Sequence, residues 1–233
     1  MAIPIYLALT GAEFRCCRQL PAKIGWMACH FSPYGTGLSN LPSRLPEGSL
    51  LILNDRTPIR GHDPQRIFEQ LSDVIRRCRC SALLVDLQRP DSPESNELAR
   101  ALTALPCPVA VSAPYADNLD CPVFLPPVPI LTPVDAYLRP WQGREIWLDA
   151  ALEGMQVTVT PAGSRSTPLS ADQVPECAHD DKTLCCHYRI DLAGEQAVFT
   201  LRRTREDVQA LLSKAEAHGA VCAVGLYQEF NEW

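Results

Sequence analysis

The chain has 233 residues, of which 46% are hydrophobic and 21% are charged, and its formal net charge is −6. This composition supplies enough apolar side chains for a sizeable core, and it excludes disorder as a description of the whole chain. The acidic balance argues against a nucleic-acid partner, which requires a basic face to displace counterions from phosphates. No apolar run reaches the roughly 20 residues of a membrane-spanning helix, so no membrane partner is expected.

The opening segment 1–14 lacks the basic start of a secretion signal and soon reaches Glu13, so it is predicted to form a first strand of a cytoplasmic protein. The eleven cysteines are therefore expected to be reduced thiols.

Segment 177–187 is rich in Cys, His and Asp but matches no zinc spacing, and strand alternation sends Cys186 and His187 to opposite faces. No metal is expected. The turn at 35–37 lacks the glycine pattern of a nucleotide-binding loop, and no cofactor is predicted.

Eight short apolar runs recur along the chain, and each ends in polar or turn residues. Several lack polar alternation, which is typical of strands that are covered on both faces in a parallel sheet. The predicted strands are 5–10, 24–31, 49–55, 81–87, 108–113, 122–127, 145–150 and 220–226.

Helix patterns with clear start signals lie between several of these runs. Two begin at an Asp or Ser that precedes proline, and two begin at capping-box patterns in which Asp replaces Glu. The four start residues are Asp63, Ser92, Thr132 and Thr204. Segments 11–22 and 114–121 are too short or too broken for full helices, so some connections are expected to be loops.

Strands that alternate with helices require parallel pairing and right-handed crossovers. We therefore predict the α/β class: a compact, irregular (β/α)8 barrel that forms a single domain over residues 1–233. A doubly wound open sheet is the alternative fold. Segment 154–203 breaks the alternation; it contains a hairpin signal at 193–195 and a polar stretch, 161–184, that we interpret as a loop. A small antiparallel β-hairpin insertion is predicted there, after the seventh strand.

In a barrel of this kind, functional residues gather at the carboxyl ends of the strands. Asp86 and Gln88 follow the fourth run and share one strand face, which predicts that they point into the barrel mouth, with Arg89 next to them. The third run ends in Asp55 and Arg56, which supply another carboxylate and a guanidinium. Each group also has a structural alternative. Asp86 would then accept hydrogen bonds from a loop or pair with Arg89. Asp55 and Arg56 would form an ion pair in solvent.

The last run predicts one further group of candidates. Ala223 and Gly225 are small enough for the crowded barrel axis, and strand alternation then puts Tyr227 and Glu229 on the same face, at the mouth. The structural alternative for Glu229 is an exposed position in a C-terminal tail.

The seventh and second runs complete the predicted site. Trp147 and Asp149 share a face of the seventh run, and an aromatic ring beside a carboxylate is suited to holding a sugar, although Trp147 is equally suited to the core. His30 ends the second run, either at the mouth or as a structural histidine.

The sequence resembles the family 18 glycoside hydrolases in the DLQ at the end of its fourth strand, in its eight-run layout and in the antiparallel insertion after the seventh strand. That family carries a D-x-x-D-x-D-x-E signature on its fourth strand. Here the four acidic positions of the signature fall on Ser81, Leu84, Asp86 and Gln88. One of the four is acidic, and the position of the general acid is an amide.

The resemblance implies substrate-assisted catalysis, in which the last Glu protonates the leaving oxygen and the Asp two residues earlier stabilises the attacking acetamido group. An amide has no proton to give at that step. We therefore expect a pseudoenzyme, a carbohydrate-recognising barrel without the usual general acid, whose ligand is a glycan or another small molecule. The alternatives are an active glycoside hydrolase that uses Glu229 or Asp55, and a non-catalytic interaction protein.

Overall fold

The computed structural model describes residues 3–59, 61–90, 92–170, 173 and 175–230. The backbone divides into two compact units. The barrel unit consists of Pro4–Pro126, Arg144–Asp149 and Val221–Trp233, and the sheet unit consists of Met1–Ile3, Pro127–Gly143 and Ala150–Ala220. That residues 1–233 form a single domain stays a prediction.

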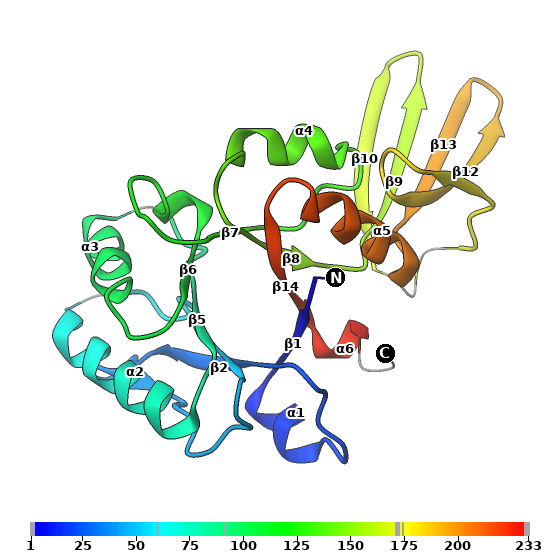
Figure 1. Cartoon of the computed structure of the whole chain (residues 1–233). Helices are drawn as coiled ribbons and strands as arrows, with labels where there is room; N and C mark the ends of the chain where they lie inside the picture. The colour runs from blue at the N-terminus through cyan, green and yellow to red at the C-terminus, as the bar shows by residue number, and fades with distance from the viewer. Residues whose placement is uncertain (1–2, 60, 91, 171–172, 174, 231–233) are drawn as a thin grey trace. The chain divides into compact units, whose positions relative to one another are not determined.

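Eight parallel strands form a closed barrel, because β1 pairs with β14 on one side and with β2 on the other (Figure 1). The strands are, in spatial order, β1 (Ile5–Leu9), β14 (Ala220–Leu226), β8 (Ile146–Ala150), β7 (Val123–Leu125), β6 (Val109–Ser112), β5 (Ala82–Asp86), β4 (Leu50–Asn54) and β2 (Ile24–Phe31). A short strand, β3 (Leu38–Ser39), pairs antiparallel with β2. The predicted barrel is confirmed, and the alternative of an open sheet is wrong.

Helices of the barrel unit begin where the local signals predict. The Asp63 side chain caps α2 (Pro64–Cys78) by accepting the Gln65 N–H, and Ser92 caps α3 (Pro93–Leu102). The remaining helical segments are short, as predicted for an irregular barrel: α1 (Gly11–Cys16), the 3-10 turn η1 (Ala113–Tyr115) and α6 (Tyr227–Phe230).

The barrel interior is filled by alternate residues of the strands, and Met27 of β2 packs against them. Its buried members are Tyr6, Ala8, Leu50, Ile52, Ala82, Leu84, Ala110, Phe124, Trp147, Cys222 and Val224. Because Cys222 and Val224 face inward, the predicted inward position of Ala223 and Gly225 is wrong: strand alternation turns both of them away from the axis. The small residues that relieve crowding at the axis come from other strands.

Gly25 is one of these small residues, and we expect Gly25→Ala to destabilise the barrel. A Cβ atom there would lie 3.0 Å from Ile52 Cδ1 and 3.3 Å from the main-chain Cα of Ala8. Overpacking of this kind costs about 1–3 kcal/mol in the free energy of unfolding, which urea denaturation measures. Gly35→Ala is the matched control, because the nearest atom to its Cβ would be Ser32 Oγ at 3.8 Å. Equal stabilities of the two variants would contradict this account.

The sheet unit contains a five-stranded antiparallel sheet in the order β10-β9-β13-β12-β11. Its strands are β9 (Gly154–Thr160), β10 (Gly163–Leu169), β11 (His179–Asp181), β12 (Cys186–Ala193) and β13 (Gln196–Arg202). The predicted hairpin is confirmed, since Ala193 pairs with Gln196 across a two-residue turn. The prediction of a loop over 161–184 is wrong, because this segment contributes β10 and β11. Most residues of these two edge strands are exposed, so their sequences lack the apolar alternation that reveals a strand.

Three helical segments accompany this sheet: α4 (Val134–Leu138), the 3-10 turn η2 (Arg139–Trp141) and α5 (Arg205–Glu216). The predicted capping box at Thr204 is confirmed, because Thr204 and Asp207 exchange side-chain and backbone hydrogen bonds. The one predicted at Thr132 is wrong: Pro133 is the N-cap of α4, and no side chain caps that helix.

Two further observations concern the cysteines and the length of the helices. All eleven cysteines are free thiols, as predicted. No helix in the part of the chain that the structure describes is long and apolar enough to cross a membrane.

Candidate functional site at the barrel mouth

A cavity of about 350 Å³ opens where β1, β2, β4 and β5 end. Because all eight strands are parallel, their carboxyl ends meet at one end of the barrel, which is where barrels of this kind build their sites. We call this space the mouth cavity. Its lining residues are Thr10, Gly11, Met27, Ala28, His30, Asn40, Ile52, Asn54, Arg56 and Asp86.

Asp86 supplies the carboxylate of the mouth cavity. It continues the inward-facing row of Ala82 and Leu84 on β5, which confirms that its strand face points into the barrel. Gln88, at the exposed rim, donates from Nε2 to Asp86 Oδ1 at 2.5 Å. Ser112 Oγ lies 3.3 Å from the same oxygen. The pair that the sequence singles out therefore occurs as a hydrogen-bonded carboxylate and amide.

The environment of Asp86 favours its neutral form. Burial raises the pKa of the Asp86 carboxyl above the usual 3.8, and the nearby Asp55 adds to this, whereas the hydrogen bonds from Gln88 and Ser112 oppose it. A raised pKa in the folded state means that folding favours the protonated acid. The contribution of Asp86 to stability is therefore largest in acid and is lost as the pH rises through the raised pKa.

We expect Asp86→Asn to stabilise the protein near neutral pH. The asparagine Oδ1 still accepts from Gln88 and Ser112, and no charge is buried. The thermal midpoint of the variant should exceed that of the parent at about pH 7.5, and the difference should disappear near pH 3, where both side chains are neutral. A difference that stays constant with pH would contradict the buried charge as its cause.

Asp55 and Arg89 brace the loop that follows β5. The Asp55 side chain is buried, and its Oδ2 accepts the backbone N–H groups of Gln88 at 3.0 Å and Arg89 at 2.7 Å. Arg89 donates in return to the carbonyl oxygens of Asp55 and Arg56. The two side chains thus fix the position of Gln88, and neither lines the mouth cavity.

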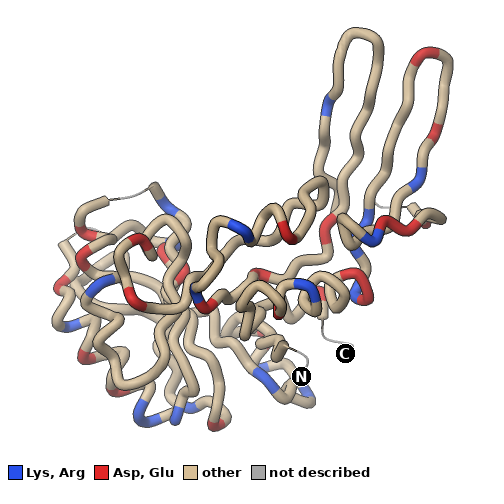
Figure 2. Tube along the Cα trace, turned by 45° about the horizontal axis from the view of Figure 1, so that its top comes forward, with Lys and Arg blue, Asp and Glu red and all other residues tan. Residues whose placement is uncertain are grey.

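The remaining wall of the mouth cavity combines apolar residues, such as Met27 and Ile52, with polar ones. His30 Nδ1 lies 2.9 Å from the Ala28 carbonyl oxygen, which accepts only, so in the neutral ring Nε2 carries no hydrogen and is an acceptor. Asn54 donates to the Met27 carbonyl and accepts from Arg56 N–H. Arg56 and Asp86 supply one charge of each sign. Over the barrel unit as a whole, basic and acidic residues are interspersed along the trace (Figure 2).

Seven of the ten predicted site residues do not line the mouth cavity: Asp55, Gln88 and Arg89, described above, and Trp147, Asp149, Tyr227 and Glu229. Trp147 is buried inside the barrel, and its Nε1 lies 3.2 Å from Glu145 Oε1, at the opposite end of β8. Asp149 is half-buried two residues further along the same strand. Tyr227 and Glu229 lie on α6, because β14 ends at Leu226; the Tyr227 hydroxyl is 3.2 Å from Cys17 Sγ. Both residues follow β14 and so lie at the same end of the barrel as Asp86. Because they are in a helix, strand alternation does not predict where their side chains point.

The sequence interpretation missed three polar residues of the mouth cavity: Thr10, Asn40 and Asn54. Thr10 and Asn54 follow inward-facing residues of β1 and β4 by two positions, so the alternation that identified Asp86 was enough to find them. Asn40 carried no such signal. It has a left-handed backbone, with φ of 57°, and its carbonyl accepts from Trp26 Nε1.

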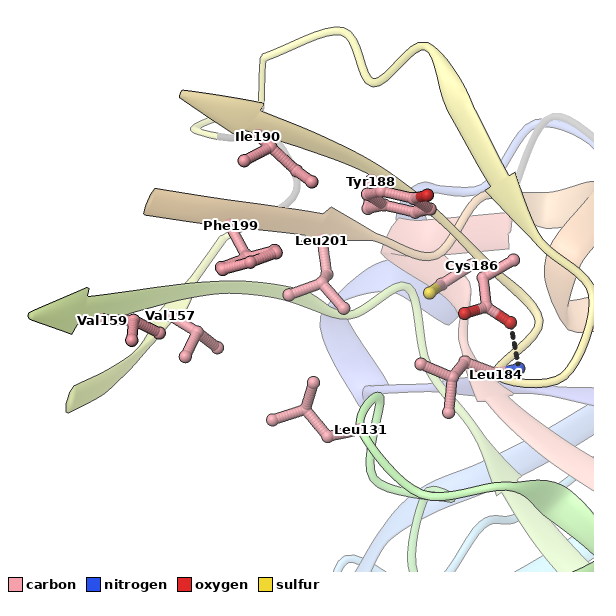
Figure 3. A pocket seen from close by; sticks show the side chains of 10 residues that line it. Leu131, Val157, Val159, Leu184, Cys186, Tyr188, Ile190, Phe199 and Leu201 are labelled. Carbon is pink, nitrogen blue, oxygen red and sulfur yellow. Dashed lines mark hydrogen bonds between the residues drawn. The ribbon is translucent and has the colours of Figure 1, made fainter. Parts of the chain in front are cut away.

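A second cavity, of about 430 Å³, lies on one face of the antiparallel sheet (Figure 3). Its walls are almost entirely apolar, with side chains such as Val157, Tyr188 and Phe199 pointing into it. The one carboxylate in its lining, Asp181, already accepts the N–H groups of Thr183 and Leu184. This groove offers apolar contact but no converging polar groups for chemistry.

One cluster in the sheet unit has the donor atoms of a metal site. Ligand atoms of Asp180, His187 and Asp207 all lie within 4.8 Å of one another. Each carboxylate has another partner: Asp207 Oδ2 accepts from the Thr204 cap and lies 2.9 Å from His187 Nδ1, and Asp180 pairs with Lys182. A helix cap and ion pairs account for the cluster without a cation. Cys186 belongs to the apolar cluster on the other face of β12, as the sequence predicted.

A scan of protein families found no family that matches the sequence, and a search of curated proteins found no relative. Solved structures do share its fold. The spore cortex-lytic enzyme SleL of Bacillus cereus aligns with 96% of this chain and 70% of its own, with a TM-score of 0.58 and 10% identity. The SleL of Bacillus megaterium QM B1551 aligns with 76% of this chain and 55% of its own, with a TM-score of 0.44 and 11% identity.

The C-terminal domain of a provisionally assigned chitinase of Desulfitobacterium hafniense DCB-2 also matches, with a TM-score of 0.48 and 10% identity over 77% of this chain and 72% of that domain. The likeness to the Bacillus cereus enzyme confirms the predicted resemblance to family 18-like barrels at the level of the fold. At 10% identity, this likeness is evidence for the fold alone.

Proposed function

We propose that the chain recognises a glycan at the mouth cavity and does not hydrolyse it, as a barrel derived from a glycoside hydrolase that has lost its general acid. The cavity sits where barrels of this fold build their sites. The enzyme SleL, whose fold this chain resembles, is described as spore cortex-lytic. Because the family 18 resemblance implies a substrate with an acetamido group, an oligomer of N-acetylhexosamine is the ligand class that we assign.

The polar groups of the mouth cavity, which lie among apolar residues such as Met27 and Ile52, support a neutral, hydroxylated ligand. Its described lining offers carboxylate, amide, hydroxyl, guanidinium and imidazole groups, with one acidic and one basic side chain. Sugars present many hydroxyl groups that donate and accept, and no net charge has to be matched. We assign Asp86 the role of accepting from the ligand at its second oxygen, since Gln88 and Ser112 both contact the first.

The observation that most supports a loss of catalysis is the hydrogen bond from the Gln88 amide to Asp86. The resemblance puts the general acid at the position of Gln88, and an amide cannot protonate a leaving oxygen. Loss of a general acid typically costs about 10²- to 10⁴-fold in rate. The amide keeps the hydrogen-bonding geometry toward Asp86, so binding is compatible with the loss of turnover.

Glu229 is the carboxylate that favours the alternative function, an active glycoside hydrolase. It follows β14 on α6 and is therefore at the same end of the barrel as Asp86. Asp55 is a weaker candidate for the acid, because its buried Oδ2 is engaged by two backbone N–H groups. We assign Asp55 a positioning role for the loop that carries Gln88.

Two measurements test the proposed function together. A glycan array should show binding of N-acetylhexosamine oligomers by the parent protein, and fluorogenic N-acetylglucosaminides should remain uncleaved. Cleavage at an enzyme-like rate would replace the proposal by the alternative of an active hydrolase. Absence of binding to every glycan would support a non-catalytic interaction protein.

We also propose a cytoplasmic location, supported by the eleven free thiols, which are typical of reducing compartments.

A further inference from the structure

A third cavity is lined by residues that follow the ends of β2 and β4, two of the strands that contribute to the mouth cavity. His30 of β2 and Asn54 of β4 are register partners, and both line the mouth cavity. Ser32 and Thr57, a few residues beyond them, line a neighbouring space of about 410 Å³. We call it the rim cavity; its other lining residues are Pro33, Gly35, Thr36, Pro58, Gly61 and His62.

The loop 32–37 that forms one wall of the rim cavity is fixed at its base. Ser32 N–H donates to the Gly37 carbonyl at 2.9 Å, and the Thr36 carbonyl accepts Asp63 N–H. His62 Nε2 lies 3.2 Å from the Ser32 carbonyl, and its ring packs edge-on against Phe31. The loop is therefore held in place against the start of α2.

This fixed loop presents a tyrosine ring to solvent. Tyr34 is 97% exposed, whereas its backbone N–H is bound by Ser32 Oγ at 3.3 Å. An aromatic ring with a polar tip is suited to stacking on a flat, amphipathic partner while its hydroxyl stays in water. Ser32, Thr36 and Thr57 line the rim cavity, and although Ser32 Oγ and Thr36 Oγ1 accept hydrogen bonds from Tyr34 N–H and Arg66, each hydroxyl still has a proton to donate.

We propose that the rim cavity and Tyr34 form a second sugar subsite, which recognises the length of a glycan that extends out of the mouth cavity. This inference rests on the proposed function. The mouth cavity is near the lower end of the roughly 300–1,000 Å³ typical of ligand pockets, so an oligomer has to continue beyond it. The rim cavity offers hydroxyl groups for the sugar edge, and Tyr34 offers a face for the next ring.

The test compares a short and a long probe by calorimetry on the intact chain: the dimer and the hexamer of N-acetylglucosamine. The parent should bind the hexamer more tightly than the dimer. Tyr34→Ala should weaken hexamer binding about tenfold, in the range for removal of an aromatic anchor, and should leave dimer binding unchanged. Tyr34→Phe keeps the ring and should bind both probes as the parent does.

Leu192→Ala is the matched control, because Leu192 is a 79% exposed apolar residue of the other unit. It should change neither affinity. Dimer binding with no effect of Tyr34→Ala on the hexamer, or with an equal effect on both probes, would overturn the rim subsite and leave the proposed function intact. Absence of binding of both probes would overturn the proposed function and the subsite with it.

Discussion

Replacing Gln88 by Glu should create hydrolysis of an activated chitobioside that the parent does not cleave. The substitution is nearly isosteric, and it puts a protonatable group 2.5 Å from Asp86, at the position that the amide nitrogen now occupies. Two carboxyl groups this close cannot both ionise readily, so the pKa of one rises and the acid form persists nearer to neutral pH. The pKa of Asp86 is already raised by burial, which adds to this effect. The expected gain is about 10²-fold or more over the parent rate.

The controls for this gain separate the acid from the change in shape. In Gln88→Met the methionine side chain is similar in size to glutamate but has no proton to give, so this variant should stay inactive. Asp86→Asn combined with Gln88→Glu should lose most of the gained rate, because the group that stabilises the attacking acetamido is removed. A folded Gln88→Glu variant that binds chitobioside without cleaving it would contradict Gln88 as the cause of inactivity. An active parent would overturn the lost-acid hypothesis.

Replacing Arg203 by Met should destabilise the antiparallel sheet by about 3–5 kcal/mol, the cost of breaking a buried ion pair from one side. The Arg203 side chain is 1% exposed and donates to Glu153 Oε2 at 2.9 Å. It also donates to the carbonyl oxygens of Val128, Leu184 and Cys185. Methionine would fill the space but leave a half-buried carboxylate and three carbonyl groups without this donor.

The backbone conformation of Cys185 adds to the expected loss of stability in the antiparallel sheet. Its backbone is left-handed, with φ of 50°, which is unfavourable for a side chain other than glycine. The bonds from Arg203 to Leu184 and Cys185 hold this turn at the start of β12. Arg203→Lys keeps the charge but lacks the planar fork, so it should recover only part of the stability.

Arg189→Met provides the matched control in the same sheet. Arg189 pairs with Asp191 on the surface, where both side chains are about half exposed. Solvent screens exposed pairs of this kind, so this variant should unfold almost as the parent does. Hydrogen exchange of the amides in β9, β12 and β13 measures the stability of the sheet directly. A loss for Arg203→Met no larger than that for Arg189→Met would contradict the proposed role of Arg203.

The amino-acid sequence by itself determined the strands of the barrel and most of its helix starts, because their signals are local, whereas closure of the sheet follows from the pairing of β1 with both β14 and β2. Each barrel strand is a short apolar run, and its burial on both faces follows from the absence of polar alternation, as in Leu50–Asn54. Asp63, Ser92 and Thr204 cap helices through bonds to residues two or three positions away. The inward direction of Asp86 followed from strand alternation, which puts Asp86 on the face opposite Leu83 and Val85.

Only the tertiary structure decided which partners the polar residues have. Asp55 is a candidate acid by position, yet its bonds go to backbone groups 33 and 34 residues away, which no local pattern reveals. The strands β10 and β11 exist because their backbones pair with β9 and β12, while their side chains stay largely exposed. The inward face of β14 depends on packing with Tyr6 and Trp147 from other strands, and α6 replaces the strand from Tyr227 onward. Hydrogen bonds and packing over long separations in the chain leave no periodic trace in the sequence, and for that reason these features required the folded structure.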